Sequence, residues 1–250
     1  FFHLGRPERA WRAATMWRTS WLSREVIVLP SFITLALAYA AAHATGRDEA
    51  LAIGALASLA AIALFVCTGM IYACIRFLRE WATPLTPINF TLLGCANGFT
   101  LAAAIAAPAA PGLLRFFVVG AIAFTLVALV GRLVAWQRNA TLAPKSTLQT
   151  AIGIKHGRIE QQSQGFMGGS FNTREFFHGR SAATLRTLRW VCLIGAFALP
   201  LVLLVGGLSA SSIAALAAAA LLQYLGLLAE RWLFFAEANH PQNLYYQRMA

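Results

Sequence analysis

Long runs of hydrophobic residues alternate with shorter polar stretches along the chain. A helix that crosses a membrane needs about 20 mostly apolar residues. Six runs meet this requirement, at approximately residues 25–45, 50–75, 88–108, 112–134, 190–207 and 211–235. The pattern therefore predicts an all-α integral membrane protein, a polytopic helical bundle with about six spans.

The polar stretches between these runs differ greatly in length. Residues 46–49 and 108–112 are tight turns, whereas residues 135–188 form one long polar insert. A loop of this length in a compact protein is usually functional. Pro30 and Pro200 fall inside predicted spans, where proline is tolerated when neighbouring groups satisfy the carbonyl that it frees. We expect residues 1–250 to form a single transmembrane bundle domain, with the insert as a docking element.

The overall composition supports a membrane protein. Hydrophobic residues make up 59% of the chain and charged residues 12%, whereas a soluble domain has roughly 45–50% apolar and about 25% charged residues. The net charge of +11 would ordinarily suggest a nucleic-acid partner. Basic patches of DNA-binding proteins do not alternate with charge-free apolar runs, however, so we expect a lipid bilayer and no nucleic acid.

The basic residues fall almost entirely on one side of the predicted bundle. Only Arg47 and Arg115 lie on the other side. The 18 on the basic side are Arg6, Arg9, Arg12, Arg18, Arg24, Arg76, Arg79, Arg132, Arg138, Lys145, Lys155, Arg158, Arg174, Arg180, Arg186, Arg189, Arg231 and Arg248. Cytoplasmic loops carry an excess of Lys and Arg. The basic side, with both visible ends of the chain, is therefore predicted to be cytoplasmic.

Neither the cysteines nor the histidines are arranged to hold a metal or haem. The cysteines occupy apolar runs without a CxxC motif, which favours buried small side chains over an iron–sulfur or zinc site. They are Cys67, Cys74, Cys95 and Cys192. No two histidines face each other across the middle of the bundle, as a b-type haem would need. They are His3, His43, His156, His178 and His240.

Polar residues at the ends of the predicted spans gather on the basic side. They are Arg24, Glu25, Tyr72, Arg76, Arg132, Glu230 and Arg231. One interpretation is that they snorkel to the interface and form ion pairs. The other is that several of them line one pocket, which would suit a quinone with its apolar tail, two carbonyl groups and need for a proton carrier. The predicted quinone-binding residues are His3, Arg6, Tyr72, Arg76 and Glu230.

Three segments resemble the dimethyl sulfoxide reductase anchor-subunit family. The first is HLGRPERAWRAATMWRTSWLSREV, at residues 3–26. Its motif runs His-Leu-Gly-x-Pro, then an Arg-Ala pair, then Ser-x-Leu-Ser-x-Glu at the start of a helix. The others are MIYACIRFLREWATPLTPINF, at residues 70–90, and LAERWLFFAEANHP near the end. The resemblance covers most of the chain.

The resemblance implies a place in a larger complex. Family members anchor an iron–sulfur subunit of the four-cluster ferredoxin-like type and a molybdopterin catalytic subunit at the bacterial inner membrane. They exchange electrons with the quinone pool, ubiquinone or menaquinone, and the histidine of their His-Leu-Gly motif, here His3, is implicated in the quinone site. Members typically have eight spans and no cofactor of their own. We therefore expect two spans before Phe1, and no haem, metal or covalently bound cofactor.

The basic opening segment and the long insert are more similar to the anchors of cytoplasmic sulfite-oxidising enzymes than to those of periplasm-facing sulfoxide reductases. The predicted function is a membrane anchor and quinone-reactive subunit of a sulfite dehydrogenase or dimethyl sulfoxide reductase, without catalysis on sulfite or sulfoxide in this chain. The predicted partner-docking residues are Arg9, Arg12, Arg18, Arg79, Arg158 and Arg174. A polytopic transporter and a haem b-containing anchor stay open as alternatives, although a transporter would be expected to have broken helices in paired halves and ionisable residues near mid-membrane.

Overall fold

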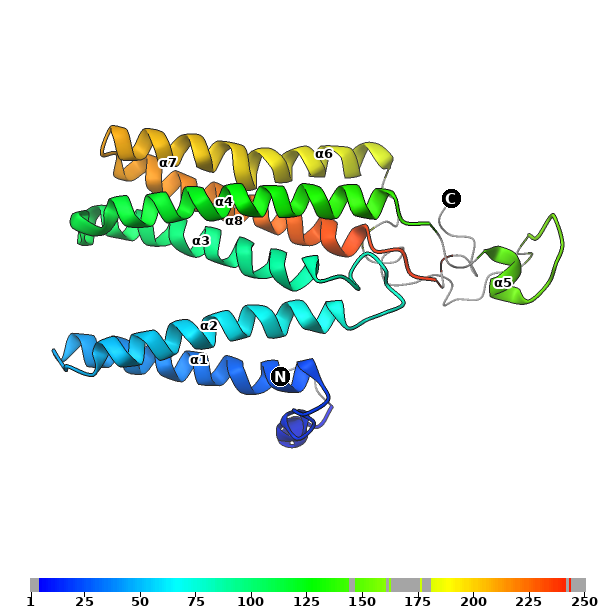
Figure 1. The fold of residues 1–250 in the computed structure, drawn as a ribbon, viewed down its shortest axis with the longest axis horizontal. Helices are drawn as coiled ribbons and strands as arrows, with labels where there is room; N and C mark the ends of the chain where they lie inside the picture. The colour runs from blue at the N-terminus through cyan, green and yellow to red at the C-terminus, as the bar shows by residue number, and fades with distance from the viewer. Residues whose placement is uncertain are drawn as a thin grey trace. The chain divides into compact units, whose positions relative to one another are not determined.

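The computed structural model describes residues 5–143, 147–160, 162, 176, 181–241 and 243. Their regular secondary structure is helical, with no strand in these ranges. Six segments are long and apolar enough to cross a membrane (Figure 1). They are α1 (Trp21–Ala44), α2 (Ala50–Ala73), α3 (Leu85–Ala109), α4 (Pro111–Ala140), the segment Ala183–Ser209 and α8 (Ile213–Ala236). The predicted all-α membrane fold and its six spans are confirmed.

Serine side chains determine where two of these helices begin. The Ser20 hydroxyl accepts a hydrogen bond from the Ser23 backbone N–H at 3.3 Å, so α1 begins at Trp21 rather than at residue 25. Ser212 caps α8 in the same way, through the Ala215 N–H at 3.3 Å. Such caps satisfy backbone donors that have no partner within the helix.

The polar insert is shorter than expected at both ends. Helix α4 continues to Ala140, and α6 (Ala182–Cys192) begins before residue 188, so the connection covers residues 141–181. Hydropathy identifies only the apolar part of a span, whereas helical hydrogen bonding continues through the polar turns that follow it. Within the connection, the short α5 (Leu148–Ile152) has a reciprocal cap between Thr147 and Thr150.

The fifth span is continuous but changes its helical form. Between α6 and α7 (Leu199–Ser209) lies the π-helical segment η3 (Leu193–Ala198), which ends two residues before Pro200. Proline has no backbone N–H, and irregular turns of this kind commonly accompany it. At the same level α8 passes very close, because a Cβ on Gly226 would lie 2.1 Å from the Ala196 nitrogen. Only glycine allows this approach.

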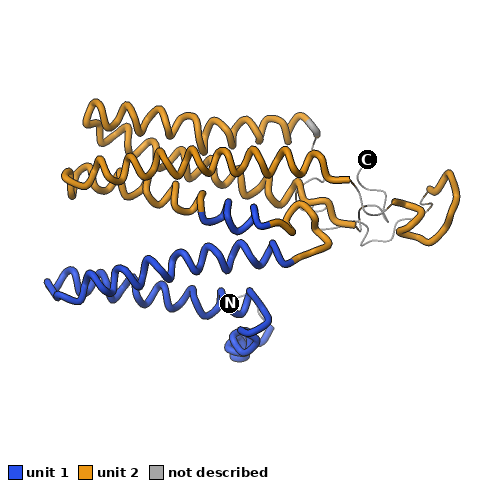
Figure 2. Tube along the Cα trace, in the orientation of Figure 1, with its two compact units in different colours: residues 1–74, 84–91 blue, residues 75–83, 92–250 orange. Residues whose placement is uncertain are grey.

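The described chain divides into two compact units (Figure 2). Unit 1 comprises residues 1–74 and 84–91, and contains η1 (Pro7–Ala14), α1, α2 and the first residues of α3. Unit 2 comprises residues 75–83 and 92–250. The single bundle domain stays a prediction.

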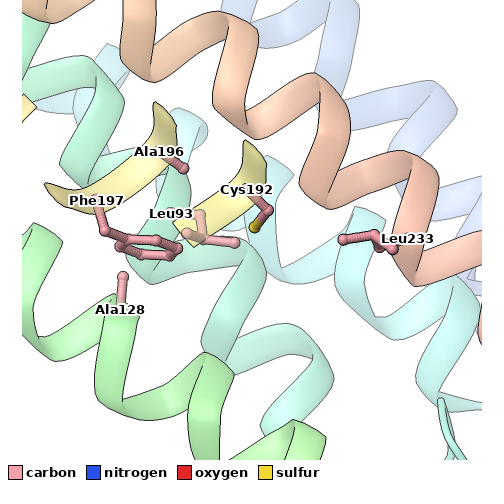
Figure 3. Close-up of a cluster of buried hydrophobic side chains, with 6 residues drawn as sticks. All are labelled: Leu93, Ala128, Cys192, Ala196, Phe197 and Leu233. Atoms are coloured by element: carbon pink, nitrogen blue, oxygen red, sulfur yellow. The ribbon is translucent and has the colours of Figure 1, made fainter. Parts of the chain in front are cut away.

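The core of unit 2 is built from small and medium-sized side chains. Figure 3 shows Leu93 from α3, Ala128 from α4 and Leu233 from α8 around Cys192 and Phe197 of the fifth span. A second cluster consists of Ala103, Val118, Ala121, Leu204, Leu216 and Ala219. Small residues allow membrane helices to approach closely, which is the main source of packing energy in lipid.

The four cysteines are free. Cys67 and Cys192 are buried, which confirms the prediction for these two, and Cys95 is partly buried. The prediction is wrong for Cys74, whose side chain is exposed. Helix α2 ends at Ala73, so Cys74 is the capping residue beyond the packed part of the helix.

Candidate functional site

In unit 1, a carboxylate and a hydroxyl meet between two apolar helices. The Thr68 hydroxyl of α2 donates a hydrogen bond of 2.5 Å to the Glu25 carboxylate of α1, and both residues are partly buried. Ionisable groups within membrane helices are costly and are usually functional. The sequence placed Glu25 at the edge of the first span but not among the quinone-binding residues.

Tyr72 lies one helical turn beyond Thr68 on α2, so the two side chains share a helix face. The ring of Tyr72 stacks on Phe90, with 5.6 Å between ring centroids and 26° between ring planes. Glu25, Thr68 and Tyr72 therefore place a carboxylate, a hydroxyl and a phenol at the end of α2 that precedes residue 75. Such groups can bind a carbonyl ligand and exchange protons with it.

The opening segment folds back on the start of α1. The Arg24 guanidinium donates hydrogen bonds of 2.9 Å to the carbonyl oxygens of Trp17 and Arg18, and lies 4.0 Å from the centroid of the Trp21 ring. Arg6 is exposed immediately before η1. The arrangement holds the basic segment next to the helix that carries Glu25.

In unit 2, two ionised side chains are buried together between α4 and α8. Arg132 Nε lies 3.2 Å from Glu230 Oε1, and the two side chains are 5% and 0% exposed. Arg231 donates to the other oxygen of Glu230 at 2.5 Å. The Arg132 guanidinium also lies 4.9 Å from the centroid of the Trp136 ring. Glu230 thus sits between two arginines, which offsets the cost of burying its charge.

This ion pair belongs to a longer polar row. Glu237, seven residues after Glu230, lies 3.8 Å from Arg132 Nη2 and 2.7 Å from Nε of the exposed Arg189 on α6. Gln223, seven residues before Glu230, donates to the Thr125 hydroxyl at 3.0 Å. Thr125 in turn precedes Arg132 by seven residues. Positions seven apart share a helix face, and this spacing is the sequence signal that could have identified the row.

The structure places the predicted quinone-binding residues in different parts of the chain. His3 lies outside the described residues. Arg6 and Tyr72 lie in unit 1, whereas the exposed Arg76 and the buried Glu230 lie in unit 2. One pocket formed by all of them stays a prediction. A ligand of Glu230 would have to compete with two arginines.

The predicted docking residues differ in their exposure and in the hydrogen bonds and ion pairs that they form. Arg9, Arg12 and Arg18 are exposed, and so is Arg158, which pairs with the exposed Glu160 at 3.7 Å. Arg79 is partly buried; its guanidinium donates to the Ala143 carbonyl oxygen, while its own carbonyl accepts from Arg138 at 3.1 Å. Arg174 lies outside the described residues. Arg79 therefore holds its loop to the end of α4, which leaves the other described arginines more available to a partner.

The family of the chain follows from a comparison that covers nearly its whole length. Residues 1–236 match the sequence profile described as the DMSO reductase anchor subunit (DmsC). The chain is a member of the DmsC anchor family. A DmsC-type chain is an anchor subunit, so the six apolar helices and the basic face belong to a multi-pass membrane protein whose function involves other subunits.

A curated relative of this DmsC-family anchor is the C subunit of the sulfite dehydrogenase of Allochromatium vinosum. The two sequences are 54% identical over 267 aligned positions, which cover 100% of this chain and 81% of the relative. No solved structure matches the anchor.

Proposed function

We propose that the chain is the membrane anchor and quinone-reactive subunit of a sulfite dehydrogenase complex. The observation that carries the proposal is the 54% identity to the sulfite dehydrogenase subunit of Allochromatium vinosum over the full length of this chain. The proposed partners are a ferredoxin-like iron–sulfur subunit and a molybdopterin catalytic subunit. Sulfite would be oxidised in the catalytic subunit, while this chain holds no haem or metal of its own and binds an exchangeable quinone.

The basic face is the proposed docking face and lies in the cytoplasm of a bacterial cell. Of the 20 Lys and Arg residues, 18 fall on this side, and the bias in short loops sets the orientation of membrane proteins. The same side has the opening segment, the insert and the tail, whereas the other side has only tight turns. A stable interface buries roughly 1,200–2,000 Å², which tight turns do not offer.

The polar end of unit 1 is the proposed place of proton exchange with the quinone. Each quinone takes up two electrons, which sulfite releases in the catalytic subunit, and two protons. Glu25 is a carboxylate within the apolar α1–α2 pair and accepts a hydrogen bond from Thr68, which lies one helical turn before Tyr72. His3 is the second proposed proton carrier, because histidine side chains exchange protons readily near neutral pH. Arg6, in the same unit, would add positive charge.

The experiment is a comparison of two electron acceptors with the complete complex. Glu25→Gln and His3→Ala should sharply lower sulfite-dependent quinone reduction while leaving sulfite oxidation with a soluble artificial acceptor unchanged. His43→Ala is the matched control, because His43 stacks on Tyr39 near the other end of α1. Quinone reduction at the wild-type rate in both variants would place proton exchange elsewhere, and loss of both activities would make these residues structural.

A further inference from the structure

A groove of about 540 Å³ runs along the surface of unit 2 between α3 and α4. Its lining residues are Phe99 from α3 and Arg115, Phe116, Val119, Gly120 and Phe124 from α4. It lies towards the end where the tight turn at Ala110 joins the two helices. Arg115 supplies the one charged side chain of this lining, and the other walls are apolar. This end is opposite to the end that holds the Arg132–Glu230 ion pair.

The ring of Phe99 forms the floor of the groove. A Cβ on Gly120 would lie 2.4 Å from this ring, so the missing side chain at residue 120 lets the ring lie against α4. The Phe99 ring also contacts Phe124, with 5.1 Å between centroids and 39° between planes, and Phe116, at 6.0 Å and 51°. Phe116 and Val119 are 64% and 55% exposed beside it. The groove is therefore a surface with fixed aromatic walls that faces the lipid.

The length of the groove matches one leaflet of a bilayer. Arg115 and Phe124 are nine residues apart on α4, which is about 13.5 Å at 1.5 Å per residue. The hydrocarbon core of a bilayer is about 30 Å thick, so that one leaflet takes up about 15 Å. The stretch between Arg115 and Arg132 is uncharged. Arg115 therefore lies near the membrane surface, and the groove leads from it towards the middle of the bilayer.

The charge of Arg115 is not neutralised by the part of unit 2 that the structure describes. Arg115 is exposed and forms no hydrogen bond or ion pair with any described residue. The described acidic residues of unit 2 lie at the opposite end of the helices or in the connection after α4, and they are Glu80, Glu160, Glu230 and Glu237. A guanidinium binds a phosphate group through two parallel hydrogen bonds. Phospholipid headgroups bring phosphate to this level of the membrane.

We propose that the groove binds one phospholipid with an anionic headgroup, from the leaflet on the less basic side. The Arg115 guanidinium pairs with the headgroup phosphate, and one acyl chain lies along Phe116, Val119 and Phe124. This site is independent of the quinone reaction and lies on the other side of the membrane from the proposed docking face.

The headgroup, rather than the acyl chain, selects the lipid. Lipid tails are as apolar as the walls of the groove, so the groove positions the chain without favouring one lipid over another. A zwitterionic lipid carries an ammonium group that opposes the charge of Arg115, whereas an anionic lipid does not. One arginine near the membrane surface supports a preference of about fivefold for the anionic lipid.

The test uses the complete complex in vesicles of phosphatidylglycerol and phosphatidylcholine. A small share of the phosphatidylglycerol carries a photoreactive diazirine near the middle of one acyl chain. Labelling should map by mass spectrometry to Phe99 and residues 116–124, and the same probe with a phosphatidylcholine headgroup should label these residues about fivefold less. Arg115→Gln should remove the difference between the two probes. Val119→Trp, at an exposed position, should fill the groove and lower labelling with both probes.

The matched control is Arg47→Gln, because Arg47 is the other basic residue on this side and does not line the groove. It should leave the preference for phosphatidylglycerol unchanged. Equal labelling by the two probes in the wild-type complex would mean that bulk lipid fills the groove without selection, which would overturn the site. A preference that persists in Arg115→Gln would overturn the role of Arg115. Label on other lipid-facing segments but none at residues 116–124 would mean that a protein segment covers the groove, and would also overturn the proposal.

Discussion

Substituting one member of the buried Arg132–Glu230 pair should destabilise the protein, because it leaves the other charge without its main partner. Glu230→Leu removes a carboxylate that is 0% exposed and leaves Arg132 in place, itself 5% exposed. Arg132→Leu removes the guanidinium and leaves the buried Glu230 carboxylate in place. The double variant replaces both charges by apolar side chains of similar size, and so separates the cost of an unpaired charge from the value of the pair.

The contacts predict an order among these variants. Removing one partner of a buried ion pair costs about 3–5 kcal/mol. After Glu230→Leu, Arg132 keeps Glu237 at 3.8 Å as its one ion-pair partner among the described residues, so we expect a loss near the upper end, about 4–5 kcal/mol. After Arg132→Leu, Glu230 keeps Arg231 at 2.5 Å, and the loss should be about 3 kcal/mol. The double variant should be more stable than Glu230→Leu alone by about 1–3 kcal/mol.

The buried cysteines provide the assay. The purified chain is heated in detergent with a maleimide that fluoresces on reaction with a thiol, so that Cys67 and Cys192 report unfolding. For a protein of this size each kcal/mol shifts the midpoint by roughly 2–4 °C, which predicts a decrease of roughly 8–20 °C for Glu230→Leu. Glu160→Leu is the control, because its ion pair with Arg158 is exposed, and its midpoint should not change.

Two results would refute this reasoning. Midpoints of both single variants within a degree or two of wild type would mean that Arg132 and Glu230 are not buried together. A double variant whose loss equals the sum of the two single losses would mean that the side chains do not interact, whatever their separation.

Four further predictions follow from other parts of the chain. Gly226→Ala should lower the unfolding midpoint strongly, because the added Cβ would overlap the backbone at Ala196. Gly98→Ala is the control and should leave the midpoint unchanged, because no atom lies within 4 Å of its added Cβ. Equal midpoints for the two variants would contradict the close approach of α8. The folded state resists protonation of His240, whose pKa lies below 6.5, so stability should fall as the pH decreases through 6.5, and a His240→Gln variant should have a weaker pH dependence of its midpoint. In right-side-out vesicles of a cysteine-free background, Arg47→Cys should react with an impermeant maleimide and Arg158→Cys should react only after permeabilisation; the reverse would invert the orientation. Replacing Arg9, Arg12 and Arg18 by Glu should weaken co-purification of the partner subunits. The control, Arg47→Glu with Arg115→Glu, should not. Equal recovery of the partner subunits with both variants would show that the opening segment is not part of the docking face.

The membrane fold could be predicted from the sequence because the apolar runs are as long as a bilayer is thick. The ends of the helices could not, since they depend on caps such as Ser20 and on polar turns such as residues 135–140, which hydropathy does not detect. The π-helical turn before Pro200 could not be predicted either. The sequence shows the proline but not how the neighbouring helix packs against it.

The candidate site was only partly predictable for a similar reason. Polar residues at span ends could be recognised one at a time, but their partners depend on which helices are neighbours. Glu230 was predicted as a quinone ligand, and the structure gives it two arginine partners. For Glu25 both an interfacial ion pair and a place in a pocket stayed open, and the structure pairs it with Thr68. His240 was considered as a possible haem ligand and set aside, and the structure places it against Phe77, more than 150 residues earlier in the chain.

The proposed function requires that this chain pass electrons between its partners and a quinone. The most direct measurement compares membranes that contain the complete complex with membranes that contain its other subunits without this chain. We predict sulfite-dependent reduction of a short-chain quinone only when the chain is present, and oxidation of sulfite by a soluble artificial acceptor in both preparations. Equal rates of quinone reduction with and without the chain would contradict the account, because the quinone would then react on another subunit.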